Sequence, residues 1–422
     1  MENTIRNLLR IGISSRSLAV LTGFLLCLSG RVSAFDTEPL TASDARRGAV
    51  ERSYFPDSPI AGEKGWLLQD RLKRYRVPGV QIAVVKGGVL DWTQGYGLAD
   101  TKTGRRVTAR TVFDAGSTSK AVTAMLIMKL ADQGKVRLDD PVNNYLISWK
   151  IPENEFTRKT PVTIRHLLSH TAGTNVSGFW GYLESDPLPN LAQILEGAPP
   201  AANAPIRVEA EPGVKWRYSG GGFVILQQMI EDVTKKPFAE AANAMIFRPL
   251  GMKRSSFVQG LPPELHSDVA VPFSEASYFK GKRLHPHAAA AGLYSTSADL
   301  ALLIGAMSAS LQGRQGAFFT RDAAQQLITP LIRDREPWNR SEPNRRNTQK
   351  DQAAGFMSLS RNGLANEASY AYYDGLNAGF RSRLMFDPAT GVGYFLGVSY
   401  RSLRSAKANN FAATNLSVAF PL

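Results

Sequence analysis

The feature that most limits the fold of this 422-residue chain is the position of its strand-forming segments. Residues 81–85 and 89–97 have the pattern of two strands, and residues 371–373, 381–386 and 392–400 have it near the other end. Most of the sequence between them favours helix or loop. Strands from the two ends satisfy their backbone hydrogen bonds most simply in one shared sheet. We therefore expect an α+β fold, with an antiparallel sheet from about residues 67–116 and 355–422 and a helical region inserted between them.

Local signals support this arrangement. Gly87 and Gly88 form a hairpin turn pair between the first two strands. The strongest helix is expected to begin at Ser117 and to end before Gly134, a glycine in the usual C-terminal position. Further helices are expected over residues 161–169, 223–234, 298–311 and 402–418. Two connections, 173–215 and the polar segment 333–352, are expected to be exposed loops.

The N-terminus has the pattern of a cleaved export signal. Three arginines lie within the first sixteen residues, residues 18–28 are apolar, and the small residues of 32–34 precede Phe35. The alternative is a membrane anchor, but the apolar run is shorter than the roughly 20 residues that a span needs. We therefore expect a signal peptide over residues 1–34 and a periplasmic or secreted product without a membrane span.

Cysteine content and charge exclude several classes. Cys27 is the only cysteine and lies within the predicted signal, so the mature chain has no disulfide, catalytic thiol or cysteine-bound zinc. Loss of residues 1–34 lowers the formal charge from +14 to +11, because that segment holds four Arg and one Glu. Lys and Arg are dispersed and no nucleic-acid module is recognisable, so we expect no nucleic-acid partner. A basic surface suits an anionic cell envelope.

The segment Ser117–Lys120 has the form Ser-x-x-Lys at a predicted helix start. Spacing of three residues places the hydroxyl and the amine on one helix face. The helix N-terminus carries partial positive charge and free N–H groups, which favour a developing oxyanion. Roughly one such match is expected by chance in a chain of this length. A second match, Ser277–Lys280, is followed by no apolar helix pattern, and we assign it to chance.

Two further segments strengthen the first match. Tyr218-Ser219-Gly220 precedes a predicted helix, where a tyrosine can shuttle protons; the alternative is a buried structural tyrosine. Tyr373-Asp374-Gly375 ends a strand, where a glycine lets the backbone approach a substrate closely.

The order Ser-x-x-Lys, Tyr-Ser-x and strand-end x-x-Gly resembles the serine β-lactamase and penicillin-binding-protein family. The nearest members are the class C β-lactamases and their esterase and D-peptidase relatives. The segments 77–79, 113–117, 167–173 and 291–295 are also similar, and the resemblance spans about residues 67–400. It implies a β-lactamase/transpeptidase-like fold.

The resemblance also implies the roles of site residues. Ser117 would be acylated, with Lys120 and Tyr218 as the general base and acid pair. The backbone N–H groups of Ser117 and Leu376 would form the oxyanion hole. Beside Leu376, the oxyanion and substrate-binding strand end would include Tyr373, Gly375 and Asn377. We expect no cofactor and no metal ion, and a small-molecule or peptide acyl substrate, with peptidoglycan fragments among the candidates.

Two positions depart from the family pattern. The second segment usually ends in Asn, where this chain has Gly220, and the third usually begins with Lys or His, where it has Tyr373. The Asn helps to bind the amide of lactams, and the cation pairs with a substrate carboxylate. Their loss favours an ester, amide or peptide substrate. A true β-lactamase, a DD-peptidase and a catalytically weak peptidoglycan-binding relative remain as alternatives.

Other enzyme classes fit less well. The chain has no Gly-x-Ser-x-Gly motif, which disfavours an α/β-hydrolase. The histidine pairs His166/His170 and His285/His287 lack a His-Glu-x-x-His pattern, so packing and hydrogen bonding are their expected roles rather than metal binding. Four aromatic residues are candidates for either substrate contact or packing: Phe179, Trp180, Tyr182 and Trp338.

Overall fold

The computed structural model describes residues 41–52, 66–272, 282–333, 348–361 and 369–399. The predicted signal peptide, the predicted helix 402–418 and Trp338 lie outside these residues. The chain divides into Met1–Ala45 and Arg46–Leu422. Of the first unit, the described part is the start of helix α3 (Ala42–Arg52), where the Thr41 hydroxyl accepts a hydrogen bond from the Asp44 backbone at 3.0 Å. The rest of this description concerns the second unit.

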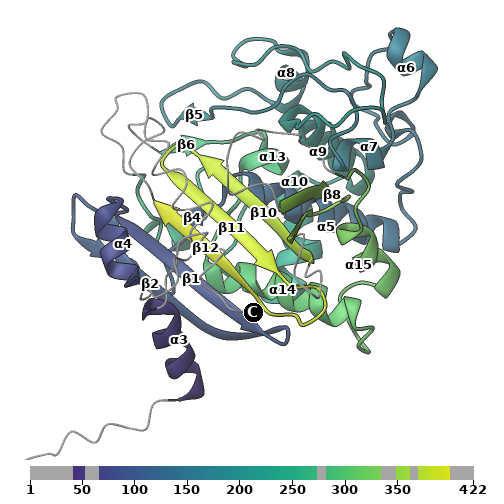
Figure 1. Cartoon of the computed structure of the whole chain (residues 1–422). Coiled ribbons are helices and arrows are strands. Elements are labelled where there is room, and N and C mark those ends of the chain that lie inside the picture. The colour runs from purple at the N-terminus through teal and green to yellow at the C-terminus, as the bar shows by residue number, and fades with distance from the viewer. Residues whose placement is uncertain (1–40, 53–65, 273–281, 334–347, 362–368, 400–422) are drawn as a thin grey trace, which may run out of the picture. The chain divides into compact units, whose positions relative to one another are not determined.

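An eight-stranded sheet joins segments from both ends of the sequence, as predicted. Its order is β3-β2-β1-β12-β11-β10-β9-β8, and each neighbouring pair is antiparallel. In Figure 1 the blue strands β1 and β2 lie beside the yellow strands β12, β11 and β10. The strands are β1 (Gly79–Lys86), β2 (Val89–Asp100), β3 (Arg105–Arg106), β8 (Thr348–Gln352), β9 (Met357–Arg361), β10 (Ser369–Asn377), β11 (Phe380–Phe386) and β12 (Gly393–Ser399).

The centre of the sheet is where the two ends of the sequence meet. Gly79 pairs with Ser399, and Val85 pairs with Gly393. Every residue of β12 and all but the last of β1 are buried, because both faces of the sheet are covered here. The predicted hairpin turn after β1 is confirmed, with φ of 59° at Gly87 and 78° at Gly88, in the left-handed region that glycine adopts without a steric cost.

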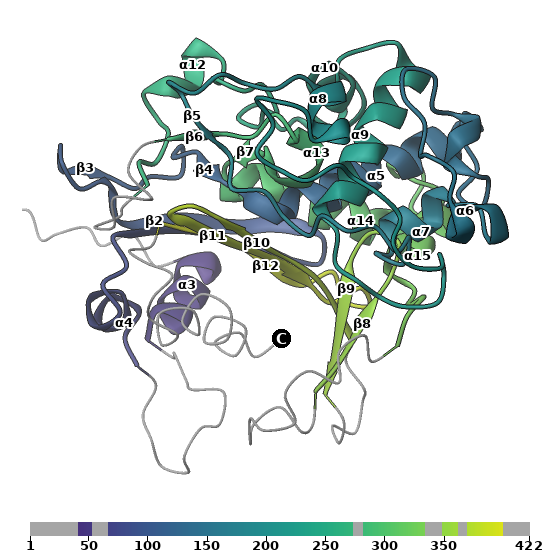
Figure 2. The ribbon, with the colours of Figure 1, turned by 90° about the horizontal axis from the view of Figure 1, so that it is seen from above.

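Most helices of this unit lie on one face of the sheet, and the short helix α4 (Leu68–Arg74) lies on the other, as Figure 2 shows. The long ones are α5 (Ser119–Asp132), α9 (Gly220–Thr234) and α14 (Ser297–Leu311). The shorter helices of this unit are α4 (Leu68–Arg74), α6 (Glu155–Lys159), α7 (Ile164–Leu168), α8 (Leu191–Glu196), α10 (Phe238–Ala242), α11 (Arg248–Leu250), α12 (Pro263–His266), α13 (Ala288–Ala291) and α15 (Arg321–Ile328). Single turns occur at η2 (Gly116–Thr118), η3 (Val142–Asn144) and η4 (Asn243–Phe247). Within the described residues, no helix is long and apolar enough to cross a bilayer.

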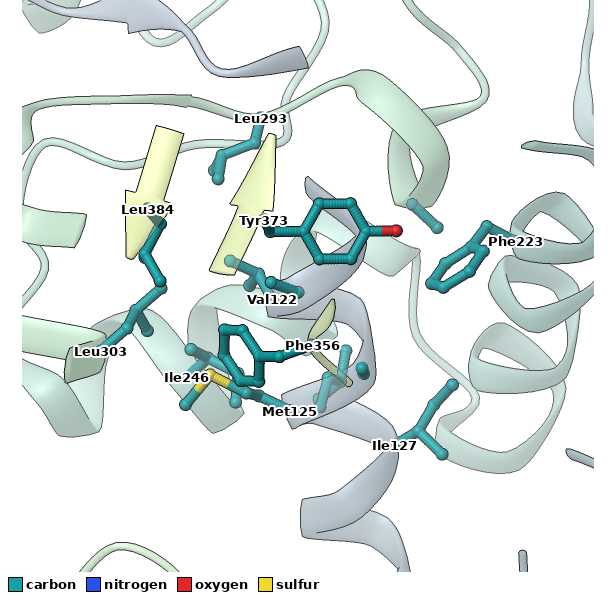
Figure 3. Packing of buried hydrophobic residues seen from close by; sticks show 14 of the residues in the cluster. Val122, Met125, Ile127, Phe223, Ile246, Leu293, Leu303, Phe356, Tyr373 and Leu384 are labelled. Atoms are coloured by element: carbon teal, nitrogen blue, oxygen red, sulfur yellow. The ribbon is translucent and has the colours of Figure 1, made fainter. Parts of the chain in front are cut away.

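Helix α5 is the centre of the main hydrophobic core. Its first ten residues, from Ser119 to Met128, are all buried. The core between α5 and the sheet includes Val122 and Met125 from the helix and Leu384 from β11, with Tyr373 of β10 alongside (Figure 3). The helix is therefore enclosed on all sides along this part of its length.

Two predicted loops contain regular structure. The segment 173–215 includes β5 (Tyr182–Leu183) and helix α8. Asn190 caps α8 by accepting a hydrogen bond from the Gln193 backbone at 2.9 Å. The prediction of an exposed 333–352 loop is wrong at its end, because residues 348–352 form β8, where Gln352 is buried and pairs with Met357. Pairing between strands creates this element, and its polar sequence carries no strand signal.

Candidate active site

The turn that carries Ser117 is held by hydrogen bonds from its own residues. The Asp114 carboxylate accepts from the Gly116 backbone at 2.8 Å, and the Ser119 hydroxyl donates to the Gly116 carbonyl at 2.5 Å. Ser117 lies in the 3₁₀ turn η2, and α5 begins at Ser119, two residues later than predicted. Gly116 and Thr118 are buried, whereas Ser117 is partly exposed. The turn therefore presents its serine to solvent and buries its neighbours.

Lys120 is buried directly behind the serine. Its side chain, with 2% exposure, donates from Nζ to Ser117 Oγ at 3.2 Å and to the Ala290 carbonyl at 2.7 Å. The same Nζ lies 4.9 Å from the ring centre of Tyr218 and 5.5 Å from that of Phe223. The Ala290 carbonyl and two aromatic rings thus surround the amine.

Tyr218 approaches from the start of α9. The next residue, Ser219, caps this helix by accepting from the Gly222 backbone at 3.0 Å, and its hydroxyl donates to the Val176 carbonyl at 2.9 Å. The Tyr218 ring packs on His170 with a centroid separation of 4.4 Å. The structure therefore brings the Tyr218 ring, about a hundred residues away in sequence, beside the Lys120 amine that contacts the Ser117 hydroxyl.

The end of β10 is in backbone contact with the serine turn. A Cβ atom on Gly116, whose φ is 50°, would lie 2.7 Å from the Leu376 nitrogen. A Cβ atom on Gly375 would lie 2.0 Å from the Ala115 carbonyl oxygen. Both positions therefore require glycine, and the Leu376 nitrogen lies beside the serine turn.

Tyr373 does not lie on the surface of this site. Its side chain is 1% exposed, and its hydroxyl lies 3.3 Å from His170 Nε2. His170 Nδ1 accepts a hydrogen bond from the Ser219 backbone at 3.2 Å, so the ring proton belongs on Nε2, which donates to the Tyr373 oxygen. Figure 3 shows this hydroxyl directed toward Phe223 of α9. The phenol is therefore part of an internal contact to the histidine under Tyr218.

The Asn377 side chain is likewise turned into the protein. It is 8% exposed, and Nδ2 donates to Asp114 Oδ1 and Oδ2, at 2.8 and 2.9 Å, and to the Ala291 carbonyl at 2.9 Å. Of the residues predicted at the strand end, Gly375 and Leu376 meet the serine turn through their backbones. The side chains of Tyr373 and Asn377 bind other protein groups instead.

The aromatic candidates have separate environments. Phe179 stacks on His287, with ring centres 4.2 Å apart and planes 20° apart. Trp180 is 62% exposed, and the buried Tyr182 accepts a hydrogen bond from the Ala202 backbone at 3.0 Å. Phe179 thus contacts His287, whose pKa is lowered by burial and also by the nearby Lys120 charge.

The histidine pairs do not form metal sites in the described part of the chain, where no group of three or more His, Cys, Asp or Glu side chains is placed to hold an ion. His166 caps α7, with Nδ1 accepting from the Thr163 backbone at 3.3 Å, and burial lowers its pKa. His170 follows that helix with a φ of 60°. His285 and His287 bond to each other, Nδ1 to Nε2, at 3.1 Å.

Sequence reasoning did not identify Asp114, nor the Ala290 carbonyl that binds Lys120. Asp114 lies within Phe-Asp-Ala-Gly-Ser, three residues before the serine, so its position was visible, although its partners were not. The Ala290 carbonyl carries no side-chain signal at all.

The family model for β-lactamases matches residues 67–414. The chain belongs to the β-lactamase family. This match confirms the resemblance inferred from the three motifs, and it covers the sheet, the helical region and the site described above.

Curated relatives include the teichoic acid D-alanine hydrolase of Staphylococcus aureus. It is 28% identical over 225 residues, which cover 53% of this chain and 52% of the relative. In strain MRSA252 the match extends over 263 residues at the same identity, 62% of each chain. The chain thus spans about half the length of the curated relatives it matches, up to three fifths in that strain.

Solved structures show the same fold. The octameric penicillin-binding protein homologue of Pyrococcus abyssi has a TM-score of 0.62 at 23% identity, over 79% of this chain and 72% of its own. The β-lactamase/D-alanine carboxypeptidase of Yersinia pestis has a TM-score of 0.62 at 20% identity, over 82% and 94%. The expected β-lactamase/transpeptidase-like fold is therefore confirmed.

Proposed function

We propose that this protein is an exported serine hydrolase that cleaves an ester, amide or peptide bond through an acyl-enzyme on Ser117. The observation that carries the proposal is the contact of 3.2 Å between Lys120 Nζ and Ser117 Oγ, at a turn that touches the Leu376 backbone. A hydroxyl, an amine and two convergent N–H groups are the parts that acyl transfer requires.

Acylation uses these groups in order. Ser117 Oγ attacks the substrate carbonyl carbon while its proton passes to the Lys120 and Tyr218 pair. The carbonyl oxygen becomes an oxyanion and is bound by the N–H groups of Ser117 and Leu376. When the tetrahedral intermediate collapses, the bond to the leaving group breaks, and the departing alcohol or amine takes a proton from the Lys120 and Tyr218 pair.

Deacylation repeats the sequence with water. The pair accepts a proton from the water as its oxygen attacks the acyl carbon, the same N–H groups bind the second oxyanion, and the Ser117 oxygen leaves and regains its proton. The acid is released and the enzyme returns to its starting protonation state.

Two features favour esters and peptides over penicillin-like acids. Tyr373, which replaces the family's cation, is buried against His170 and offers no charge to a substrate carboxylate. Gly220, which replaces the family's Asn, offers no amide. The names of the relatives add D-alanyl compounds as a substrate class, since one is a teichoic acid D-alanine hydrolase. D-alanyl esters and peptides are therefore the first substrates to compare.

Export is part of the proposal. The arginine-rich start, the apolar run 18–28 and the small residues of 32–34 support cleavage before Phe35. The mature charge of +11 suits a substrate attached to an anionic envelope polymer. N-terminal sequencing of the product is expected to begin at Phe35; an intact Met1 on cytosolic protein would contradict export.

The test of the activity combines labelling and kinetics. A serine-directed fluorophosphonate is expected to label Ser117, and short activated esters, including D-alanyl esters, are expected to be hydrolysed with a higher kcat/KM than benzylpenicillin. If kcat/KM for benzylpenicillin exceeds that for the esters by about tenfold or more, the protein is a β-lactamase and not an esterase or peptidase. Absence of both label and hydrolysis would indicate the catalytically weak alternative.

A further inference from the structure

A buried polar cluster lies behind the serine turn and contains no residue used in the mechanism above. Asp114, three residues before Ser117, is 3% exposed, and Asn377, one residue after Leu376, is 8% exposed. The Asn377 amide donates to both oxygens of the Asp114 carboxylate, at 2.8 and 2.9 Å. The same carboxylate accepts from the Gly116 backbone at 2.8 Å.

We propose that Asp114 and Asn377 form a clamp that sets the separation of the two oxyanion-hole N–H groups. The proposal rests on the acyl-transfer function proposed above. One half of the clamp lies on the segment that carries the Ser117 N–H group. The other half lies on the strand end that carries the Leu376 N–H group. No covalent linkage shorter than some 260 residues connects these segments, so noncovalent contacts alone hold them together.

The backbone contacts between these segments limit only how closely they approach. Gly116 and Gly375 let the two backbones meet, with Cβ positions 2.7 Å from the Leu376 nitrogen and 2.0 Å from the Ala115 oxygen. Steric contact of this kind does not prevent separation. Hydrogen bonds between the segments resist their separation. Asn377 of β10 donates to Asp114, and Ser382 of β11 donates to the Ala115 carbonyl at 2.7 Å. Asn377 is the tie adjacent to the Leu376 N–H group.

The chemistry of the cluster makes the clamp rigid. The Asn377 nitrogen faces three oxygens, two from Asp114 and the Ala291 carbonyl at 2.9 Å, so a flipped amide would place its own oxygen against all three. A buried carboxylate that loses a donor pays a large desolvation penalty, which resists any opening of the contact.

Two histidines complete the cluster on the far side. His285 Nε2 lies 3.1 Å from Asn377 Nδ2 and 3.6 Å from Asp114 Oδ2, and His285 Nδ1 contacts His287 Nε2 at 3.1 Å. Both rings are almost fully buried, at 1% and 0% exposure. They close off the carboxylate from solvent, so the clamp does not exchange its partners for water.

Asn377→Leu is the test, because it keeps the side-chain volume and removes the donors. A misplaced oxyanion donor typically costs about 10²–10³-fold in kcat. We expect kcat for an activated ester to fall by about 10²-fold with KM little changed. Inhibition by phenylboronic acid, which forms a tetrahedral anion on the serine, should weaken by a similar factor. Rates are expressed per active site, counted by fluorophosphonate titration.

The matched control is Asn143→Leu. Asn143 also bonds through its amide, donating to the Ile151 carbonyl at 3.0 Å and accepting from the Ile151 backbone at 2.9 Å, remote from the serine. Asn143→Leu should lower the melting temperature and leave kcat per active site and the affinity for phenylboronic acid unchanged. Asp114→Asn keeps an acceptor for Gly116 and serves if Asn377→Leu does not fold; we expect a smaller loss, about tenfold, in the same two constants.

The outcomes separate the two proposals. A wild-type protein that neither hydrolyses esters nor takes label at Ser117 refutes the serine-hydrolase function, and the clamp with it. A wild-type protein that does both, beside an Asn377→Leu protein with normal kcat per active site and normal boronate affinity, refutes the clamp alone. The clamp is also refuted if Asn377→Leu lowers only the titrated fraction of active sites.

Discussion

The ring of Phe179 occupies the space beside Gly220 that a side chain at that position would need. A Cβ atom on Gly220 would lie 3.1 Å from Phe179 Cε2 and 3.1 Å from the Ser177 carbonyl oxygen. Phe179 in turn stacks on His287. The departure from the family's Asn at this position is therefore accompanied by an aromatic ring that fills the space, so one substitution is not enough to restore the family pattern.

Gly220→Asn is expected to destabilise the protein by about 1–3 kcal/mol through overpacking against Phe179, without raising benzylpenicillin hydrolysis. Gly220→Asn combined with Phe179→Ala should recover part of this stability and raise the benzylpenicillin-to-ester ratio of kcat/KM. Thermal unfolding and paired kinetics measure both. Gly222→Ala is the control, because its Cβ would meet nothing closer than 3.4 Å. If Gly220→Asn alone has full stability, the Phe179 ring moves aside without a cost in folding free energy.

Ser117→Ala should abolish fluorophosphonate labelling and ester hydrolysis, because the other hydroxyls at the turn, those of Thr118 and Ser119, are buried and hydrogen-bonded within the protein. Ser277→Ala, in the second Ser-x-x-Lys match, should leave both unchanged. Treatment with EDTA should also have no effect. Full activity in Ser117→Ala, or EDTA inhibition that zinc reverses, would contradict the serine mechanism and indicate a metal site at one of the histidine pairs.

Lys120→Ala and Tyr218→Phe should each slow acylation by about 10²–10⁴-fold, the usual contribution of general acid–base groups. The double variant should lose much less than the product of the two single losses, because the amine lies over the Tyr218 ring and the pair acts as a unit. Stopped-flow acylation rates test this. Multiplicative losses would mean that the two residues act independently.

Tyr373→Phe should destabilise the protein by about 1–3 kcal/mol, since it leaves the buried Nε2–H of His170 without the acceptor at 3.3 Å. The phenol has no contact with substrate in this arrangement. The ratio of KM for an anionic ester to KM for a neutral ester of equal size should therefore be the same in Tyr373→Phe and in the wild type. A selective rise in KM for the anionic ester would instead place the phenol at the substrate carboxylate.

The stability of the protein should fall as pH decreases below about 6.5, in part because of His287. Burial, followed by the nearby His285 and Lys120 charges, lowers the pKa of His287 well below its ordinary value of 6.5. The unfolded chain therefore binds a proton that the folded chain does not, and stability falls by up to about 1.4 kcal/mol per pH unit for that proton. His287→Leu should flatten the slope of unfolding free energy between pH 4 and 6.5, measured in urea.

The exposed His266 provides the comparison for that experiment. His266→Gln removes an imidazole without changing a buried one, so the two variants separate the effect of losing a buried ring from that of losing an exposed one. Equal slopes in the wild type and His287→Leu would show that the His287 ring takes up its proton in the folded protein as easily as in the unfolded one.

The sequence by itself determined the features that depend on local spacing. These are the strands at both ends, the Gly87-Gly88 turn, and the three-residue spacing from Ser117 to Lys120 that places the two groups on one helix face. The sequence also placed Tyr373 and Gly375 at a strand end. The strand continues to Asn377, and because strand side chains alternate with a period of two, positions 373, 375 and 377 share one face of β10.

Only the tertiary structure decided what that face meets. Alternation gives the direction of a side chain relative to its neighbours, but not whether the face is open to a substrate or covered by other elements. In the folded protein α9 and the segment around Asp114 cover it, so Tyr373 reaches His170 and Asn377 reaches Asp114. These partners lie about 200 and 260 residues away in sequence, and contacts across such distances depend on the packing of the whole domain, which no local pattern encodes.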